Sequence, residues 1–351
     1  MADYKNQHFV PRCVMKPFSL NGEGKAINLY TFGQKRIVQN AAVRNQCARD
    51  YMYGAGGHIE HGLATIEAAY SKALARVESR TETTEDLQLL RFFAYLQLRR
   101  TEIAILRLKQ AEDAFFKDIF GKDAPEGLPL EYFMRASLQL CSDTREKIDD
   151  LKIRIIENKT DVEFVTSDDP AIMTNRFAAQ KLNEDGFGVI SSGLLLVLPL
   201  TPRLAALCYD GLVYTAPNLI GGRMILKDAR DVESLNELHY LKAAASIYFS
   251  SWETAEYVRD QFERARRCRI DEWFVLKHLI YVRTDETGDI YREGTLEEAK
   301  ASGRSIANSS FKYPIPSRWL SELTYRRPPR TFSNGTAIGH VRKAEWLKPQ
   351  R

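Results

Sequence analysis

Helical and strand-like patterns occupy separate parts of this sequence, and that order is what most limits the folds it can adopt. Apolar residues recur at every third or fourth position through residues 59–80, 85–120 and 130–158, which predicts three long helices. From residue 161 onward the pattern changes to short apolar segments separated by turn residues. We therefore expect an α+β fold, in which an N-terminal segment and three long helices pack on a mostly antiparallel sheet.

The strand-like segments predict one extensive sheet that is closed by further helices. The candidates are residues 27–32, 162–167, 187–190, 194–200, 204–209 and 212–216. The run from Leu194 to Leu198 is apolar on both faces of a pleated strand, so it should lie inside the sheet with both faces covered. Residues 229–249 and 252–267 predict two helices that follow the sheet.

The chain of 351 residues exceeds the usual size of a single domain, and a change in composition suggests where to divide it. We expect residues 1–268 to form the α+β domain. Its parts are a helical layer at 56–158, a sheet at 161–216 and closing helices at 229–267. Residues 269–351 then form a C-terminal extension, which becomes rich in proline and in basic side chains.

The basic character of the chain is concentrated in that extension. Residues 312–351 contain nine Lys or Arg and two Asp or Glu, a balance of +7, whereas the first 311 residues contain 41 and 44, a balance of −3. A basic tail on a nearly neutral body suggests an acidic partner, and we expect nucleic acid. A solvated tail that only maintains solubility would explain the same asymmetry.

Nothing in the sequence predicts a membrane or secreted protein. The apolar run from Leu194 to Leu198 has five residues, far short of the roughly 20 that span a bilayer. The N-terminus lacks the apolar core of a signal peptide. The five cysteines are far apart and odd in number, which fits reduced thiols rather than a disulfide framework. We expect a cytoplasmic protein without a membrane partner.

Two adjacent carboxylates, Asp168 and Asp169, end a β-prone segment and precede Pro170. Carboxylates at the end of a strand can bind Mg²⁺ or Mn²⁺, because hard cations prefer oxygen ligands. Ser167-Asp168-Asp169-Pro170 is equally good turn chemistry, since Ser and Asp side chains accept hydrogen bonds from nearby backbone N–H groups. The sequence leaves both interpretations open.

Other polar residues occupy positions that suggest a site. His8 could act as a general acid or base or as a metal ligand, although a lone histidine is often only packed and hydrogen-bonded. Glu67 lies on the apolar face of the first helix, where a carboxylate needs a partner, and Arg99 or Arg100 could supply a structural ion pair. Asn236, between two apolar helix positions, is a similar buried polar candidate.

The familiar phosphate-binding and nucleophile motifs are missing from the sequence. It contains no Gly-x-Gly-x-x-Gly, no Gly-x-x-x-x-Gly-Lys-Ser/Thr and no Gly-x-Ser-x-Gly. We therefore predict no nucleotide cofactor.

Two short segments, Gln7-His8-Phe9-Val10-Pro11 and Ser167-Asp168-Asp169-Pro170, together resemble the signatures of a known family. The chain is similar to a family of bacterial, fungal and viral domains of unknown function with an N-terminal His-Phe-x-Pro signature and a Ser-Asp-x-Pro motif. The resemblance covers residues 5–255 and includes Phe18, Leu29-Tyr30-Thr31, Asp50-Tyr51, Tyr53, Glu67, Arg100-Thr101, Pro199-Leu200-Thr201-Pro202 and Asn236. Asp169 departs from the family, which more often has Asn there.

The resemblance points to residues rather than to a reaction. It implies His8, Glu67 and Asp168 as candidate catalytic residues, and as a candidate Mg²⁺ or Mn²⁺ site if they converge. The candidate substrate-binding residues are Gln7, Arg100, Ser167 and Asn236.

Two functional hypotheses follow, with a helical scaffold for protein contacts as a third. The first is a metal-dependent nuclease or phosphoesterase whose basic extension holds nucleic acid. The second is a non-catalytic module that binds nucleic acid or a protein, in which the same polar residues form a buried structural network and C-terminal aromatics stack on bases. Asp168 and Glu67 facing one open cleft would favour the enzyme, and a sealed, hydrogen-bonded Asp168 would favour the module.

Overall fold

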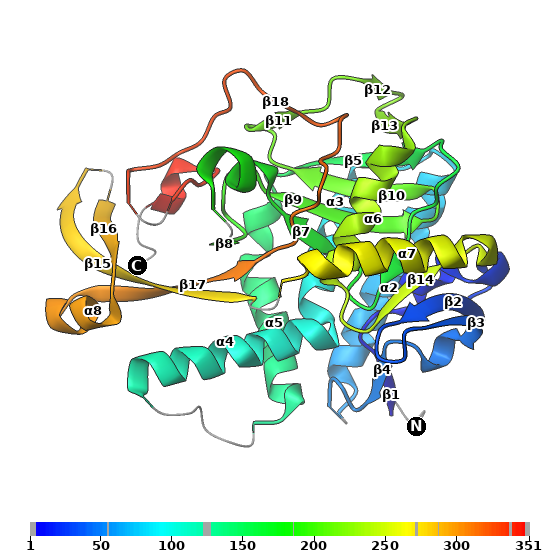
Figure 1. The fold of residues 1–351 in the computed structure, drawn as a ribbon, viewed down its shortest axis with the longest axis horizontal. Coiled ribbons are helices and arrows are strands. Elements are labelled where there is room, and N and C mark those ends of the chain that lie inside the picture. The colour runs from blue at the N-terminus through cyan, green and yellow to red at the C-terminus, as the bar shows by residue number, and fades with distance from the viewer. Residues whose placement is uncertain are drawn as a thin grey trace.

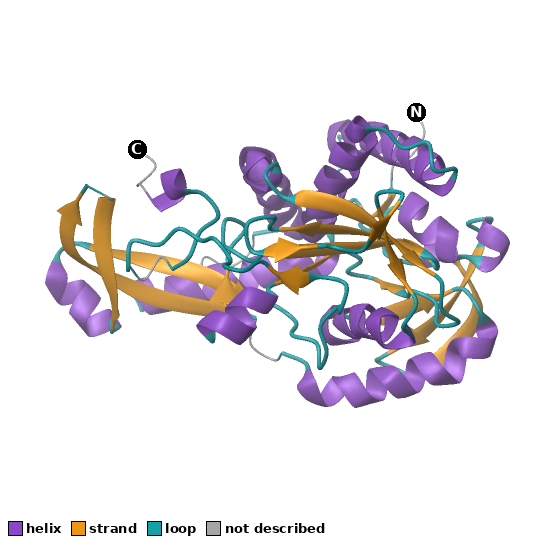
Figure 2. Ribbon diagram, turned by 90° about the horizontal axis from the view of Figure 1, so that it is seen from above, coloured by secondary structure: helices purple, strands orange, loops and turns teal. Residues whose placement is uncertain are grey.

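The computed structural model describes residues 5–54, 56–121, 128–184, 186–270, 273–286, 288–336 and 339–347. It confirms the α+β class: a helical layer, two main sheets and a C-terminal β arm follow one another along the chain (Figure 1). Seen from above, helices lie on both sides of the central strands, and the arm extends away from them (Figure 2).

Four helices, rather than the expected three, form the helical layer within the described residues. They are α2 (His58–Glu78), α3 (Thr84–Arg100), α4 (Glu102–Phe120) and α5 (Leu130–Thr144). The predicted helix 85–120 is wrong because it is interrupted at Thr101, whose backbone is extended. The Thr101 hydroxyl accepts a hydrogen bond from the Ala104 N–H and so caps the start of α4.

The predicted helix 130–158 is also wrong in its second half. The chain leaves α5 at Thr144, passes through one short 3₁₀ turn and enters strand β5 (Lys152–Asn158). β5 contains Ile153, Ile155 and Ile156, and branched side chains of this kind favour a pleated surface over a helix. The charge spacing that suggested a helix does not outweigh this preference and the burial of these side chains.

The larger sheet has six strands. Their order is β12 (Leu219–Ile220), β13 (Arg223–Leu226), β5, β10 (Leu204–Tyr209), β9 (Leu195–Thr201) and β7 (Ile172–Thr174). Only the β13–β5 pair is parallel. Every residue of β9 is buried, which confirms the prediction of an interior strand from the apolar run that begins at Leu194. Helix α3 packs on β5, β9 and β10.

A second, antiparallel sheet brings distant parts of the chain together. Its order is β3 (Arg36–Ala42), β2 (Ala26–Thr31), β14 (Ser246–Phe249) and β6 (Thr166–Ser167). Helices α6 (Ala229–Lys242) and α7 (Ala255–Ala265) pack against this side of the molecule, α6 on β6, β7 and β13 and α7 on β2 and β3 (Figure 1).

The predicted helix 229–249 therefore ends early, at Lys242, and its last third is the strand β14. The N–H groups of Ala244 and Ala245 donate to the carboxylate of Asp168 instead of continuing the helix. Ile247 and Tyr248 then pair with both β2 and β6. A contact with a distant residue thus decides where this helix stops.

Small elements complete the body. β1 (Asn6–His8) pairs with β4 (Ala48–Asp50), and β11 (Tyr214–Thr215) pairs with β18 (Thr324–Tyr325). The single turn α1 (Arg12–Met15) follows Pro11, a position where proline fits a helix start. Of the predicted strand 162–167, only Thr166 and Ser167 pair with another strand, as β6.

The C-terminal part of the chain forms an arm and then returns to the body. β15 (Phe274–Asp285), β16 (Gly288–Gly294) and β17 (Ser305–Lys312) carry the short helix α8 (Leu296–Ser302), and β17 pairs with β8 (Gly186–Phe187). Beyond the arm, Tyr325 stacks on Tyr214 with ring centroids 5.4 Å apart.

Arg342 attaches the end of the described chain to the helical layer. Its buried guanidinium pairs with the Asp150 carboxylate at 2.8 Å and donates to the carbonyls of Lys147, Val189 and Ser191. A cation counted in the basic extension is therefore used inside the fold.

The described helices include none that is both long and apolar enough to cross a bilayer. All five cysteines are free thiols, as their spacing predicted.

Replacing Arg342 with Met should lower the free energy of unfolding by about 3 kcal/mol, because Asp150 and three carbonyls lose a buried cation. The matched control is Lys343→Met, next along the chain, whose ammonium is 41% exposed and 3.8 Å from Glu345. This control should change stability by less than about 0.5 kcal/mol. Chemical denaturation measures both, and equal losses would contradict the role assigned to Arg342.

Candidate functional site

The N-terminal signature is held by a polar cluster centred on Arg100, a side chain that is 1% exposed. Its guanidinium donates to the Glu67 carboxylate at 2.7 Å, to the Tyr53 hydroxyl and to the backbone carbonyl of His8. The Gln7 amide donates to the Gly54 carbonyl and accepts from the Tyr53 N–H. The structure therefore brings together four of the predicted site residues, in contacts that fix β1 against the helical layer.

His8 is neutral and both of its ring nitrogens are engaged. Nε2 accepts a hydrogen bond from Arg12 Nε at 3.0 Å, so Nδ1 carries the proton and donates to the Gln46 carbonyl at 3.1 Å. Burial, with the Arg12 charge as the next cause, lowers the pKa of His8 to about 4. No lone pair of this imidazole is left to bind a metal ion or accept a proton without breaking the Arg12 contact.

Asp168 accepts hydrogen bonds from the segment that leaves α6. Its Oδ1 accepts from the Ala244 N–H at 2.9 Å and its Oδ2 from the Ala245 N–H at 2.6 Å, while its own N–H donates to the Ser246 carbonyl. Burial raises the pKa of the Asp168 carboxyl to about 6, against the opposing effect of these backbone donors. The carboxyl thus works as a cap on the α6–β14 junction.

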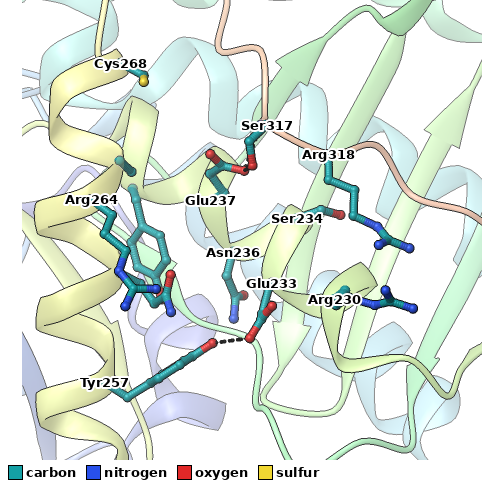
Figure 3. Close-up of a pocket in the computed structure, with 13 residues that line it drawn as sticks. Arg230, Glu233, Ser234, Asn236, Glu237, Tyr257, Arg264, Cys268, Ser317 and Arg318 are labelled. Atoms are coloured by element: carbon teal, nitrogen blue, oxygen red, sulfur yellow. Dashed lines mark hydrogen bonds between the residues drawn. The ribbon is translucent and has the colours of Figure 1, made fainter.

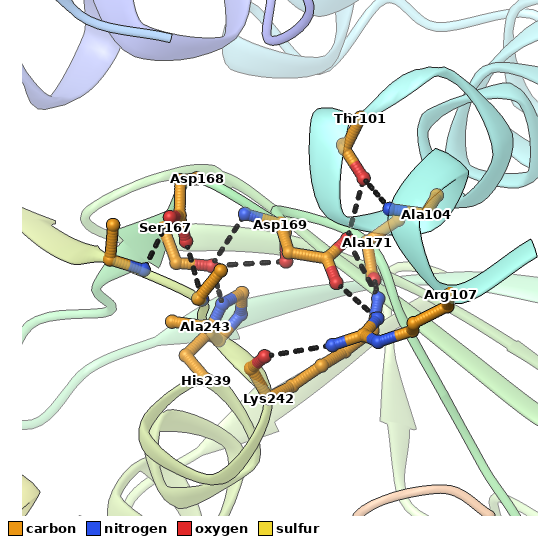
Figure 4. A network of polar contacts seen from close by, with 12 residues as sticks. Thr101, Ala104, Arg107, Ser167, Asp168, Asp169, Ala171, His239, Lys242 and Ala243 are labelled. Atoms are coloured by element: carbon orange, nitrogen blue, oxygen red, sulfur yellow. Dashed lines mark hydrogen bonds and ion pairs between the residues drawn. The ribbon is translucent and has the colours of Figure 1, made fainter. Parts of the chain in front are cut away.

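Asp169 forms a fully buried ion cluster with two cations (Figure 4). Its carboxylate lies 2.8 Å from an Arg107 nitrogen on α4 and 2.9 Å from Lys242 Nζ at the end of α6, and it accepts from the Thr101 hydroxyl. Burial alone would raise the pKa of Asp169, but Lys242 and Arg107 outweigh it and hold the pKa below its usual value. Burial lowers the pKa of Lys242 to about 8, an effect that the charge of Asp169 opposes.

The face of Arg107 is covered by the ring of Trp273, 3.8 Å from the guanidinium carbon to the ring centroid. Arg269 donates to the Tyr240 and Ala243 carbonyls at the end of α6, where basic side chains satisfy terminal carbonyls. The beginning of the C-terminal extension thus closes the ion cluster from one side.

Ser167 and His239 form a contact that resembles a nucleophile and base but is buried. The Ser167 hydroxyl lies 3.3 Å from His239 Nδ1 and also accepts from the Asp169 N–H, as in a serine turn. Both side chains are completely inaccessible, and burial lowers the pKa of His239 to about 3. A base needs access to a substrate, so this pair stabilises the turn at Pro170 rather than serving chemistry.

The side chain of Asn236 makes the hydrogen bonds that a neighbouring strand would otherwise make to the segment before β6. Its Oδ1 accepts from the Val165 N–H at 3.0 Å and its Nδ2 donates to the Glu163 carbonyl at 2.8 Å. The predicted strand 162–167 is extended here, but a side-chain amide takes the hydrogen bonds that a neighbouring strand would make. Asn236 also lines a cleft, described next, and is the one predicted site residue that does so.

A cleft of about 430 Å³ opens between α6, α7 and the segment that contains Ser317 (Figure 3). Arg264 projects into it from α7, while Arg230 and Arg318 lie on the opposite side. Within it, the Tyr257 hydroxyl donates to Glu233 at 2.6 Å. A smaller cavity of about 180 Å³, with mostly apolar walls, adjoins it along α6 and α7.

The contacts of the three predicted metal ligands fall into two groups. His8 and Glu67 take part in the Arg100 cluster, whereas Asp168 bonds to the α6–β14 junction. In the part of the chain that the structure describes, no group of three or more His, Cys, Asp and Glu side chains is placed to hold a metal ion.

The sequence interpretation missed Lys242, Arg107 and His239, which surround the acidic pair. His239 and Lys242 lie three residues apart on α6 among buried neighbours, and buried polar residues at helical spacing were the available signal. Tyr240, which lines the cleft, carried no signal, because an aromatic side chain on a helix is ordinary.

These contacts define an α+β protein organised around a buried acidic pair at the end of α6. Residues 6–253 match the family described as "Protein of unknown function (DUF4238)", and because this is more than half of the chain, the protein belongs to that family. The expected membership of a family of unknown function is confirmed, while the His-Phe-x-Pro and Ser-Asp-x-Pro signatures remain predictions. No curated protein and no solved structure matches the chain.

The buried, neutral His239 predicts a pH dependence of stability. Its pKa is lower in the folded than in the unfolded protein, so the unfolded chain binds the proton first and stability falls as the pH drops below about 6.5. Between pH 6.5 and pH 4, His239→Gln should lose roughly 3 kcal/mol less unfolding free energy than the wild type. Denaturant titrations at several pH values measure this, with the exposed His61→Gln as the control. Parallel pH profiles for the wild type and His239→Gln would contradict it.

Proposed function

We propose that the protein is a non-catalytic ligand-binding module, in which the polar motif residues support the fold and the cleft between α6 and α7 receives the ligand. The observation that carries this proposal is a contrast between two places. The polar atoms of the motif residues have protein partners, whereas Arg264, an exposed cation that lines the cleft, has no hydrogen-bond or ion-pair partner among the described residues.

The contacts of the motif residues support the structural half of the proposal. A metal-dependent nuclease or phosphoesterase would need His8, Glu67 and Asp168 to present free lone pairs to one Mg²⁺ or Mn²⁺ ion. His8 instead bonds through both nitrogens, Asp168 through both oxygens, and Glu67 through its ion pair with Arg100. Binding a metal ion there would break contacts that hold β1, α3 and β14 in place.

Three groups of the C-terminal extension that could contact nucleic acid are occupied within the protein. Arg342 pairs with Asp150, and Trp346 lies against the cations of Lys147 and Arg342. Tyr325 stacks on Tyr214. Phosphate contacts and base stacking need free cations and free aromatic faces, so these three side chains are not suited to that role.

A thermal-shift panel of small molecules tests the proposal. The panel contains amino acids, sugars, nucleotides, aromatic acids and short fatty acids, and at least one class should raise the melting temperature of the wild type. Gln261→Trp places a large ring in the cleft from α7 and should abolish that shift. Gln139→Trp, at an exposed position of α5, is the matched control and should keep it. No shift with any class, or equal shifts in Gln261→Trp, would refute the proposal.

A further inference from the structure

Two cavities share one wall, and their chemistry differs. The cleft of about 430 Å³ and the adjoining slot of about 180 Å³ are both lined by Asn236, Tyr240 and Tyr257. The remaining walls of the slot are mainly apolar, from Val162, Phe164, Val165, Phe249 and Val258. A molecule that occupies both would meet an apolar environment at one end and a polar one at the other.

The slot has room for a small apolar group. A dry apolar cavity of about 150 Å³ in a protein can bind benzene, so the slot fits one aromatic ring or a short acyl chain. Burying such a group contributes affinity in proportion to the apolar area removed from water. This end of the site therefore selects for shape and apolarity.

The charges at the other end favour an anion. The two acids that face the cleft already accept hydrogen bonds, Glu233 from the Tyr257 hydroxyl and Glu237 from the N–H and hydroxyl of Ser317. Among the arginines, Arg230 pairs with Asp228, and Arg318 lies 3.7 Å from the same carboxylate.

Arg264 differs from those two arginines. It has no carboxylate or hydrogen-bond partner among the residues that the structure describes, and it points into the cleft (Figure 3). An arginine in this position can bind a carboxylate or phosphate through two parallel hydrogen bonds.

Tyr240 lies where the two cavities meet, since it lines both of them. Its side chain is only 3% exposed, and burial, with the nearby Tyr257 and Glu233 as smaller causes, raises its pKa, so the hydroxyl is neutral. The oxygen is sealed from solvent and has no hydrogen-bond partner among the described atoms, so a ligand at the junction would contact the ring of Tyr240 rather than its hydroxyl.

We propose that this site binds an amphipathic anion: an aromatic ring or short acyl chain in the slot, and a carboxylate or phosphate that pairs with Arg264 in the cleft. The ring of Tyr240 packs against the ligand at the junction of the two parts. This inference rests on the proposed function and adds the ligand class to it. If another class of the panel binds at the cleft, only this inference fails; if no class binds there, both fail.

Isothermal titration calorimetry with four probes tests both ends of the site. Octanoate and phenyl phosphate carry an apolar group and an anion, 1-octanol carries only the former and inorganic phosphate only the latter. Octanoate or phenyl phosphate should bind at least about tenfold more tightly than 1-octanol and inorganic phosphate. Comparison of the first two shows whether the carboxylate or the phosphate is preferred. Equal affinities for octanoate and 1-octanol, or no saturable binding of any probe, would overturn the proposal.

Three variants assign the contacts. Arg264→Gln should weaken the better anion about tenfold and leave 1-octanol unchanged, whereas Arg267→Gln, an arginine that is exposed like Arg264 but lies outside the cleft, should change neither. Tyr240→Phe keeps the ring and removes only a sealed hydroxyl, so the affinity for the anion should stay within about twofold of the wild type. Equal effects of Arg264→Gln and Arg267→Gln, or a large loss of affinity in Tyr240→Phe, would contradict the assignment.

Discussion

The buried ion cluster of Asp169 with Lys242 and Arg107 is the interaction on which the arrangement of this fold depends. An ion removed from water costs several kcal/mol even in real proteins, and only close opposite charges and further hydrogen bonds offset this. Asp169 is completely buried and has two cations within 3 Å, one from α4 and one from α6. The helical layer and the closing helices must therefore approach each other at this carboxylate, because any other packing leaves a charge unpaired.

The neighbouring Asp168 determines the path of the chain at the same place. Its two oxygens take the N–H groups of Ala244 and Ala245, which ends α6 and directs the chain into β14 between β2 and β6. Asp168 and Asp169 face different partners, so the two carboxyls have opposite pKa shifts although they are adjacent. The cleft lies on the same helix, α6, and its position follows from where this junction sets that helix relative to α7.

Local sequence patterns predicted the elements that depend mainly on the spacing of nearby apolar residues and on residue type. The α+β class, helix α2 and the interior strand β9 follow from apolar periodicity, and the turn at Ser167 follows from residue type. Local patterns did not predict where the helices expected at 130–158 and 229–249 end. The first stops before a segment of branched, buried side chains, and the second stops at the carboxylate of Asp168, a residue distant in sequence. Glu67 and Arg100 form the ion pair that the sequence allowed. The convergence of Asp168 with His8 and Glu67 remains a hypothesis of the sequence alone, since spacing along a chain does not determine which side chains meet.

The unfolding free energy of Asp168→Ala, measured beside hydrolysis of bis(p-nitrophenyl) phosphate with Mg²⁺ or Mn²⁺, distinguishes a structural Asp168 from a catalytic one. The free energy should fall by about 2–3 kcal/mol, because two buried N–H groups lose their acceptor, and hydrolysis should not differ between variant and wild type. The exposed Asp161→Ala should be neutral in both measurements. Unchanged stability of Asp168→Ala, together with loss of a metal-dependent hydrolysis that the wild type performs, would contradict the structural role of Asp168.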